Sequence, residues 1–137
     1  MTNFLENTTW AKKFKSSAPG GRGKSLLVHV VCELIQQRPD LPLTVKEIAA
    51  AANLTPNHFT TLFHNHTGSS FNEYLTKQRI LRAQKLLLNP TLSINEIAGL
   101  TGYDDPGYFT RRFRQQTGLS PRDWRNHKAS MQKLSPK

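Results

Sequence analysis

The stretch LTVKEIA at residues 43–49 returns as LSINEIA at residues 92–98. One inserted residue follows, and beyond it Phe59 of the first copy matches Phe109 of the second at an offset of 50. Further identities continue at the same offset to the ends of both copies. A repeat of this length indicates that one supersecondary unit is used twice in the chain.

Both copies predict a short helix, a tight turn and a longer helix. The first helices begin at capping boxes, in which a hydroxyl accepts a hydrogen bond from the third helical amide: Thr44 with Glu47, and Ser93 with Glu96. Asn53 and Gly102 stand at the turns, and these two residue types reach the left-handed backbone conformation at the lowest cost. Ala49 and Ala98 leave room for the two helices of each copy to cross closely. This is the arrangement of a helix-turn-helix unit, present in duplicate.

The second helix of each copy begins with an N-cap residue followed by proline, at Thr55-Pro56 and at Asp105-Pro106. A longer helical segment, residues 71–89, lies between the two copies, and no stretch predicts a strand. We therefore expect an all-α fold in which a long linking helix joins two helix-turn-helix subdomains.

The composition favours a polyanionic partner and argues against several other classes of protein. Nineteen Lys and Arg stand against nine Asp and Glu, a formal charge of +10, and such an excess on a small protein favours nucleic acid. No stretch approaches the roughly 18 apolar residues that would cross a bilayer, and the first residues predict no secretion signal. Cys32 is the only cysteine, which excludes an internal disulfide and a multi-cysteine zinc site. Paired carboxylates, a nucleophile triad and an HExxH array are missing, so we expect no enzyme, no cofactor and no metal.

Two short patterns suggest other chemistry but lack its context. Residues 18–25, APGGRGKS, resemble a phosphate-binding loop, but no buried strand precedes them as that motif requires. His29 and Cys32 lie three apart on an expected helix, which permits a metal pair, but two ligands make a poor site.

Two segments point to a known family. The linking segment FNEYLTKQRILRAQKLLL at 71–88 and the second copy IAGLTGYDDPGYFTRRFRQQTGLSP at 97–121 resemble the DNA-binding domain of AraC/XylS-type bacterial transcription regulators. The resemblance covers about residues 24–126. It implies about seven helices and binding of the domain, as a monomer, to two successive major-groove segments of double-stranded DNA. It also implies a cytoplasmic transcription activator, nucleoid-associated when bound to DNA, that contacts RNA polymerase through a surface which the sequence does not identify.

These patterns define an expected domain organisation. The expected parts are an N-terminal arm or linker at 1–23, the DNA-binding domain at 24–128 and a C-terminal tail at 129–137. Within the domain they are the first helix-turn-helix at 44–68, the linking helix at 71–89 and the second helix-turn-helix at 93–118. Family relatives usually have a separate effector-binding and dimerisation domain, which here would precede residue 1, although some relatives stand alone at about this length.

The outward faces of the two longer helices are the expected base-reading surfaces. The family pattern places base contacts at Asn57, Thr60 and Thr61 in the first copy and at Pro106, Gly107, Thr110 and Arg111 in the second. Arg111 is the strongest candidate, because a guanidinium paired with guanine O6 and N7 is the commonest specific contact. Position 61 is often arginine in relatives, and Pro106 and Gly107 have no side chain that reads a base. Water, methyl contacts or DNA shape are therefore expected to supply part of the sequence preference.

Phosphate contacts are expected where helix N-termini and basic side chains meet the nucleic-acid backbone. The candidates are Thr44, Lys46, His64, Ser93, Asn95, Arg82, Arg112 and Arg114. Bonds within the protein, or a solvated position, compete with this role for Arg82 and for its neighbour Arg79.

Two other functions stay open from the sequence alone. One is a nonspecific or architectural nucleic-acid-binding protein that uses charge alone, and the other is a helical protein-interaction adaptor. Sequence-dependent binding that persists at higher salt separates specific from nonspecific DNA binding. Absence of any DNA binding at low salt would favour the adaptor.

Overall fold

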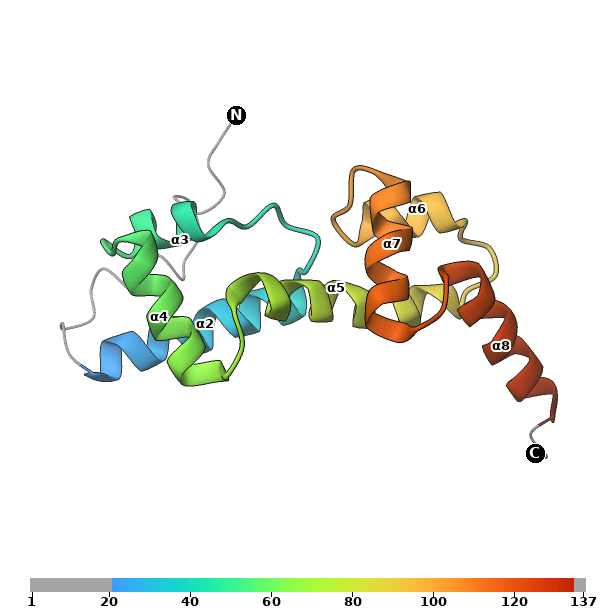
Figure 1. Ribbon diagram of the computed structural model, residues 1–137, viewed down its shortest axis with the longest axis horizontal. Helices are drawn as coiled ribbons and strands as arrows, with labels where there is room; N and C mark the ends of the chain where they lie inside the picture. The colour runs from blue at the N-terminus through green and yellow to red at the C-terminus, as the bar shows by residue number, and fades with distance from the viewer. Residues whose placement is uncertain (1–20, 135–137) are drawn as a thin grey trace. The chain divides into compact units, whose positions relative to one another are not determined.

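The structure, a computed structural model, describes residues 21–134 of the 137-residue chain, with side chains described for residues 25–131. Seven α-helices and no strand form this part of the chain, which confirms the predicted fold class (Figure 1). The helices are α2 (Gly21–Gln37), α3 (Val45–Ala51), α4 (Pro56–Thr67), α5 (Phe71–Leu87), α6 (Ile94–Leu100), α7 (Pro106–Thr117) and α8 (Pro121–Leu134). None of these helices is both long enough and apolar enough to cross a membrane.

The chain divides into two compact units, the first ending at Tyr74 and the second beginning at Leu75. The helix-turn-helix of the first unit is α3 and α4, and that of the second is α6 and α7. The linking helix α5 begins in the first unit and contributes most of its length to the second.

The predicted caps and turns are present in both units. The side chains of Thr44 and Ser93 accept hydrogen bonds from the amides of Glu47 and Glu96, at 3.1 and 3.0 Å. The turn residues have left-handed backbones, with φ of 58° at Asn53 and 96° at Gly102. The polar side chains at the cap positions therefore satisfy amides that would otherwise lack a partner, and Asn and Gly adopt the left-handed turn conformation at low cost.

The core of the first unit is built around α4. Phe59 and Phe63 are fully buried and pack edge-on against Phe71 of α5, with ring centroids 6.0 and 5.7 Å apart. Buried aliphatic residues of the neighbouring helices complete the cluster: Leu27, Val31 and Ile35 of α2, and Ile48 and Ala49 of α3. Since full burial of one such side chain stabilises a fold by about 1.5–3 kcal/mol, this cluster fixes which face of α4 points to solvent.

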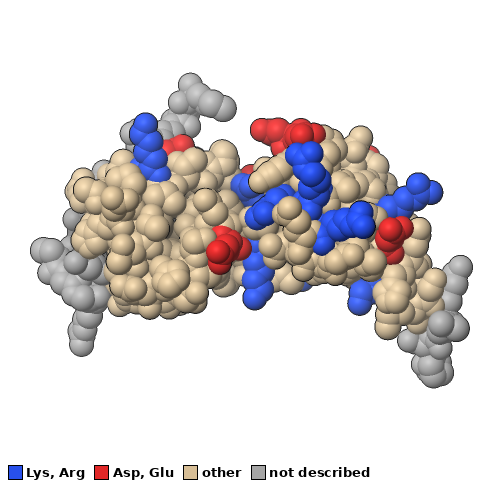
Figure 2. All heavy atoms as spheres, in the orientation of Figure 1, with Lys and Arg blue, Asp and Glu red and all other residues tan. Residues whose placement is uncertain are grey.

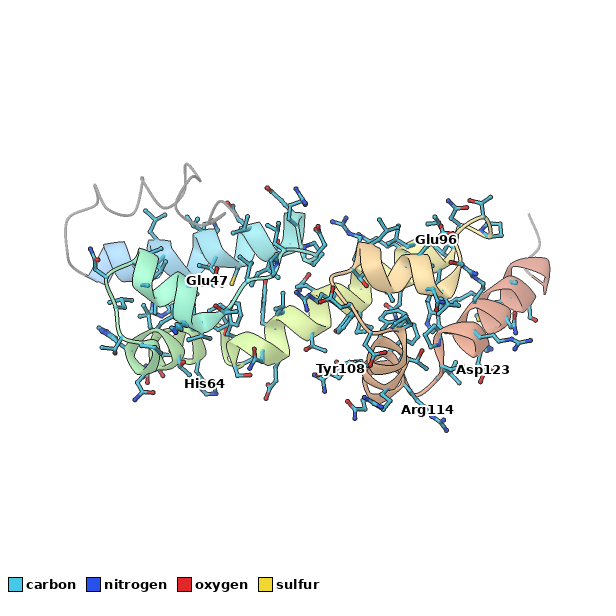
Figure 3. All side chains as sticks on the ribbon, turned by 90° about the horizontal axis from the view of Figure 1, so that it is seen from above. Glu47, His64, Glu96, Tyr108, Arg114 and Asp123 are labelled. Carbon is cyan, nitrogen blue, oxygen red and sulfur yellow. The ribbon has the colours of Figure 1, made fainter. Side chains whose placement is uncertain are left out.

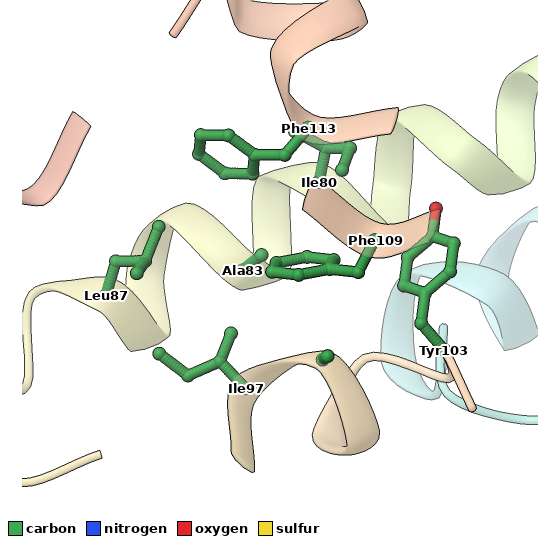
Figure 4. Packing of buried hydrophobic residues seen from close by; sticks show 8 residues of the cluster. Ile80, Ala83, Leu87, Ile97, Tyr103, Phe109 and Phe113 are labelled. Carbon is green, nitrogen blue, oxygen red and sulfur yellow. The ribbon is translucent and has the colours of Figure 1, made fainter. Parts of the chain in front are cut away.

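The core of the second unit repeats this plan around α7 (Figure 4). Phe109 and Phe113 point toward α5 and pack with its residues Ile80, Ala83 and Leu87 in one buried cluster. Ile97 and Ala98 of α6 are also fully buried. Trp124 of α8 packs edge-on against Phe113 at 6.2 Å. The two inward-facing phenylalanines thus orient α7 as the corresponding pair orients α4.

The first and last described helices extend into the segments expected to be a linker and a tail. α2 begins at Gly21, inside the expected linker, because burial of residues further along the helix outweighs the low helix propensity of its first glycines. α8 continues to Leu134, through most of the expected tail, because no proline or glycine occurs in it after Pro121. The expected arm at residues 1–20, and the start of the sequence that resembles a phosphate-binding loop, lie outside the described residues.

Candidate nucleic-acid interface

The outward face of α4 is polar, and the helix contains no Lys, Arg, Asp or Glu. Asn57, Thr60 and Thr61 are exposed, as the inward orientation of the phenylalanines requires. The hydroxyl of Thr60 donates to the carbonyl of Pro56 at 2.8 Å, so Thr60 offers a ligand its methyl group and its oxygen lone pairs. His64 is exposed further along the same helix (Figure 3). This face can bond base edges but has little charge with which to attract phosphate.

The outward face of α7 is basic and aromatic. Gly107 and Arg111 are exposed, and Thr110 is half-buried. The guanidinium carbon of Arg111 lies 5.8 Å from the ring centroid of Tyr108. Arg114 is exposed further along α7 (Figure 3). The second helix therefore presents cations where the first presents neutral side chains.

The predicted phosphate contacts at the shorter helices are exposed. Lys46 and Asn95 lie in the first turns of α3 and α6, next to Thr44 and Ser93. The oxygens of these two capping residues already accept an amide hydrogen bond each. Their hydroxyl hydrogens remain available to donate to an anion.

Arg112 is placed differently from the other candidates. Its guanidinium donates to the hydroxyl of Thr76 on α5 at 3.0 Å and to the side chain of Gln115 at 2.8 Å. Arg82 is half-buried. Arg112 therefore links α7 to α5, and of the arginines on α7 only Arg111 and Arg114 are fully on the surface.

A buried tyrosine lies beneath this surface. Burial raises the pKa of Tyr103, and the positive charges of Arg79 and Arg112 partly offset that effect. The Tyr103 hydroxyl is buried without a hydrogen-bond partner. Its ring makes contacts on two sides, with the ring of Phe109 at 5.4 Å and with the guanidinium of Arg79 at 5.3 Å.

Charge is distributed unequally between the two units. From Leu75 onward the sequence has twelve Lys and Arg against four Asp and Glu, a formal +8, whereas residues 1–74 have seven against five, a formal +2. In Figure 2 the blue atoms of Lys and Arg gather over the second unit, while the visible face of the first is mostly uncharged. Attraction to a polyanion therefore comes mainly from the second unit.

The sequence did not reveal two residues that shape this region. Arg125 of α8 donates to the carbonyls of Leu87, Asn89 and Leu92, all more than thirty positions away, so no local pattern could identify it. Tyr108 contacts Arg111 three residues later on the same helix, and that helical spacing was a signal that could have been noticed. No three His, Cys, Asp or Glu side chains come together as metal ligands among residues with described side chains.

Residues 48–127 match the family model described as a helix-turn-helix domain. A relative in Escherichia coli strain K12, the uncharacterized HTH-type transcriptional regulator YpdC, is 38% identical over 109 residues, which cover 80% of this chain and 37% of that protein. The lactose operon transcription activator of Staphylococcus xylosus is 33% identical over 110 residues, covering 75% of this chain and 39% of the activator. The chain thus spans less than half the length of these relatives.

Solved structures show the same architecture. The DNA-binding domain of AdpA, a global transcriptional factor, in complex with a target DNA aligns with a TM-score of 0.70 at 30% identity, over 80% of this chain and 97% of that one. The C-terminal domain of AraT, a response regulator from Geobacillus stearothermophilus, gives a TM-score of 0.69 at 33% identity, over 74% of this chain and 84% of that one. With its duplicated helix-turn-helix and its linking helix, the chain belongs to the AraC-type helix-turn-helix family.

Proposed function

We propose that the chain is the sequence-specific, double-stranded DNA-binding part of a bacterial transcription activator, and that α4 and α7 each enter a major-groove segment. The observation that supports this most directly is that each helix is placed in the same way within its own unit. Each begins at a capped proline, buries two phenylalanines and exposes a polar side chain, Thr61 or Arg111, at the same position. The AdpA domain, which was solved on DNA, has the same fold.

Individual roles follow from side-chain chemistry. Asn57, Thr60 and Thr61 on α4, and Gly107, Thr110 and Arg111 on α7, are the proposed base-facing positions. Arg111 is matched to guanine, whereas Asn57 is matched to adenine, with which an amide forms two hydrogen bonds. Lys46 and Arg114 are the exposed basic side chains proposed to contact phosphate. The proposal assigns binding to these residues, and no catalysis.

The remaining parts of the proposal come from the relatives. Because regulators such as YpdC are more than twice as long as the matching region, we propose an effector-binding or dimerisation domain upstream in the full-length protein. By the same likeness to named activators, the protein would act in the cytoplasm, on the nucleoid, and contact RNA polymerase.

Selection of bound sequences from a random duplex pool, followed by fluorescence anisotropy, tests the DNA-binding proposal. We expect a gap in affinity between the selected and scrambled duplexes that persists at higher salt. Equal affinities, falling together with salt, would instead establish the charge-only binding that the +8 of the second unit permits.

A substitution then tests the base-reading role of α7. Arg111→Ala should lower discrimination at one or two base pairs, by about 1–3 kcal/mol for a lost bidentate contact. Arg122→Ala removes the same charge from the exposed surface of α8 and serves as the control. Equal weakening on every sequence by Arg111→Ala would reject the base-reading role.

A further inference from the structure

Four side chains of the second unit form a continuous series of two cation–aromatic contacts and one contact between rings, which reaches the surface of α7. The guanidinium of Arg79 on α5 lies 5.3 Å from the ring centroid of Tyr103. The Tyr103 ring meets that of Tyr108 edge-on at 5.9 Å and 75°, and the guanidinium of Arg111 lies 5.8 Å from the Tyr108 ring. We call these four residues the arginine–tyrosine series.

The inner end of the series is held firmly. Gly102 has a φ of 96°, and a Cβ atom there would come within 3.0 Å of the Arg79 guanidinium, so the absence of a side chain allows Arg79 to approach Tyr103. Tyr103 itself is only 9% exposed. Tyr108, by contrast, is 41% exposed and lies in the first turn of α7. The Tyr108 ring therefore packs against the buried Tyr103 and contacts Arg111 at the proposed DNA surface.

The first unit has no counterpart of this series. At the offset that relates the two copies, His58 and Thr61 occupy the positions of Tyr108 and Arg111. Leu54, which follows the turn residue Asn53, stands where Tyr103 follows Gly102. The series is therefore a feature of one copy and is not required by the helix-turn-helix fold itself.

We propose that Tyr108 is a positioning residue for Arg111. The Tyr108 ring holds the Arg111 guanidinium in place and thereby sets base discrimination by the second helix-turn-helix. This inference rests on the proposed DNA-binding function. A long, mobile side chain loses conformational freedom when it binds, and a side chain that is already held in place loses less. A guanidinium can contact an aromatic ring and still direct N–H donors at the O6 and N7 atoms of guanine.

A free-protein measurement tests the contact without DNA. The arginine Nε–H resonances of the whole chain are recorded by ¹H–¹⁵N NMR, and the Arg111 resonance is assigned with Arg111→Lys. Tyr108→Leu should shift this resonance because the ring current of Tyr108 is removed, whereas His58→Leu at the equivalent position should not. An Arg111 resonance that is unchanged in Tyr108→Leu would overturn the inference, whatever the chain binds.

A double-mutant cycle on DNA tests the consequence. The base pair that Arg111 contacts is the one at which Arg111→Ala loses discrimination. At this base pair, Tyr108→Leu should reduce the preference for guanine by about two- to fivefold, the range expected for an exposed cation–π contact. Affinity for a scrambled duplex should change less than twofold, and Tyr108→Phe, which keeps the ring, should retain most of the preference. In the Arg111→Ala background Tyr108→Leu should have no further effect.

Three outcomes would contradict the positioning role. They are an unchanged preference in Tyr108→Leu, equal weakening on all duplexes, and an additive loss in the Arg111→Ala background, which would make Tyr108 a DNA contact in its own right. If the wild-type chain shows no sequence preference at all, the proposed function fails, while the NMR result still decides whether Tyr108 holds Arg111. Should Tyr108→Leu melt below the assay temperature, Tyr108→Gln takes its place in the same cycle.

Discussion

The guanidinium of Arg125 on α8 donates to the carbonyl oxygen of Leu87, the last residue of α5, at 2.9 Å. The same side chain also donates to the carbonyls of Asn89 and Leu92, at 3.2 and 2.8 Å. Carbonyls at the end of a helix have no partner within it, so one arginine satisfies the end of α5 and the loop that follows. Arg125 thereby ties three segments of the second unit together.

Arg125→Ala should therefore destabilise the protein by about 2 kcal/mol, within the range for hydrogen bonds to a charged group. Arg125→Lys should recover only part of this loss, because an ammonium cannot match the planar fork of the guanidinium. Urea unfolding followed by circular dichroism measures both. Arg122→Ala, at an exposed position of the same helix, should change the unfolding free energy by less than about 0.5 kcal/mol. A similar loss in both alanine variants would show that charge, and not the three carbonyl contacts, is responsible.

Removal of the buried Tyr103 hydroxyl should not lower the stability of the protein. Because this hydroxyl has no hydrogen-bond partner, Tyr103→Phe should leave stability at pH 7 unchanged or raise it by up to about 1 kcal/mol. Tyr74→Phe is the matched comparison: the Tyr74 hydroxyl accepts a hydrogen bond from Gln36 at 2.7 Å, so its loss should cost about 1 kcal/mol. Thermal unfolding should therefore show a loss of stability for Tyr74→Phe and none for Tyr103→Phe. A clear loss of stability in Tyr103→Phe would show that its hydroxyl has a hydrogen-bond partner.

The same tyrosine predicts a dependence of stability on alkaline pH. Burial raises the pKa of Tyr103, so the fold favours its neutral form. This contribution is complete below the pKa of an unfolded tyrosine, about 10, and is lost as the pH rises through the higher pKa of the folded state. Wild-type stability should thus fall above about pH 10, and Tyr103→Phe should flatten the fall. Parallel curves for the two proteins between pH 9 and 11.5 would contradict this.

Two glycines of the second helix-turn-helix should respond oppositely to alanine. Gly102 has a φ of 96° and faces the Arg79 guanidinium, so Gly102→Ala should destabilise by more than about 1 kcal/mol. Gly99 lies in α6 with open space around its Cα, so Gly99→Ala should stabilise by about 0.5–1 kcal/mol through helix propensity. Equilibrium unfolding measures the change in the free energy of unfolding for both variants. Equal changes would mean that the positive φ of Gly102 and its contact with Arg79 do not matter for stability.

The sequence predicts most of the fold because its local signals agree with one another. Thr44 and Ser93 cap the helices that the capping boxes predict, and Asn53 and Gly102 form the predicted turns with positive φ. These signals depend only on residues a few positions apart. The contacts of Arg125, and that of Arg112 with Thr76, were not predictable in the same way, because these partners lie more than thirty residues away. The helical structure of most of the expected tail was not predicted, because a helix end without a glycine or proline has no local sequence signal.

The uneven charge of the two units predicts which substitutions change the salt dependence of DNA binding. Each phosphate that a basic side chain neutralises contributes about −0.9 to the slope of log K against log salt. Arg114→Gln, in the unit with a formal +8, should reduce the magnitude of the slope by about 1 on both selected and scrambled duplexes. In the first unit, Lys46→Gln should give a comparable reduction, because Lys46 is the one Lys or Arg among the contacts proposed for residues 25–74. Lys128→Gln removes the same charge from α8, where the ammonium lies over the Trp124 ring at 5.4 Å, and should leave the slope unchanged. Anisotropy titrations at four salt concentrations measure all three slopes. A reduction by Lys128→Gln equal to that of Arg114→Gln would mean that the overall charge of the unit, and not a phosphate contact by α7, determines the salt dependence.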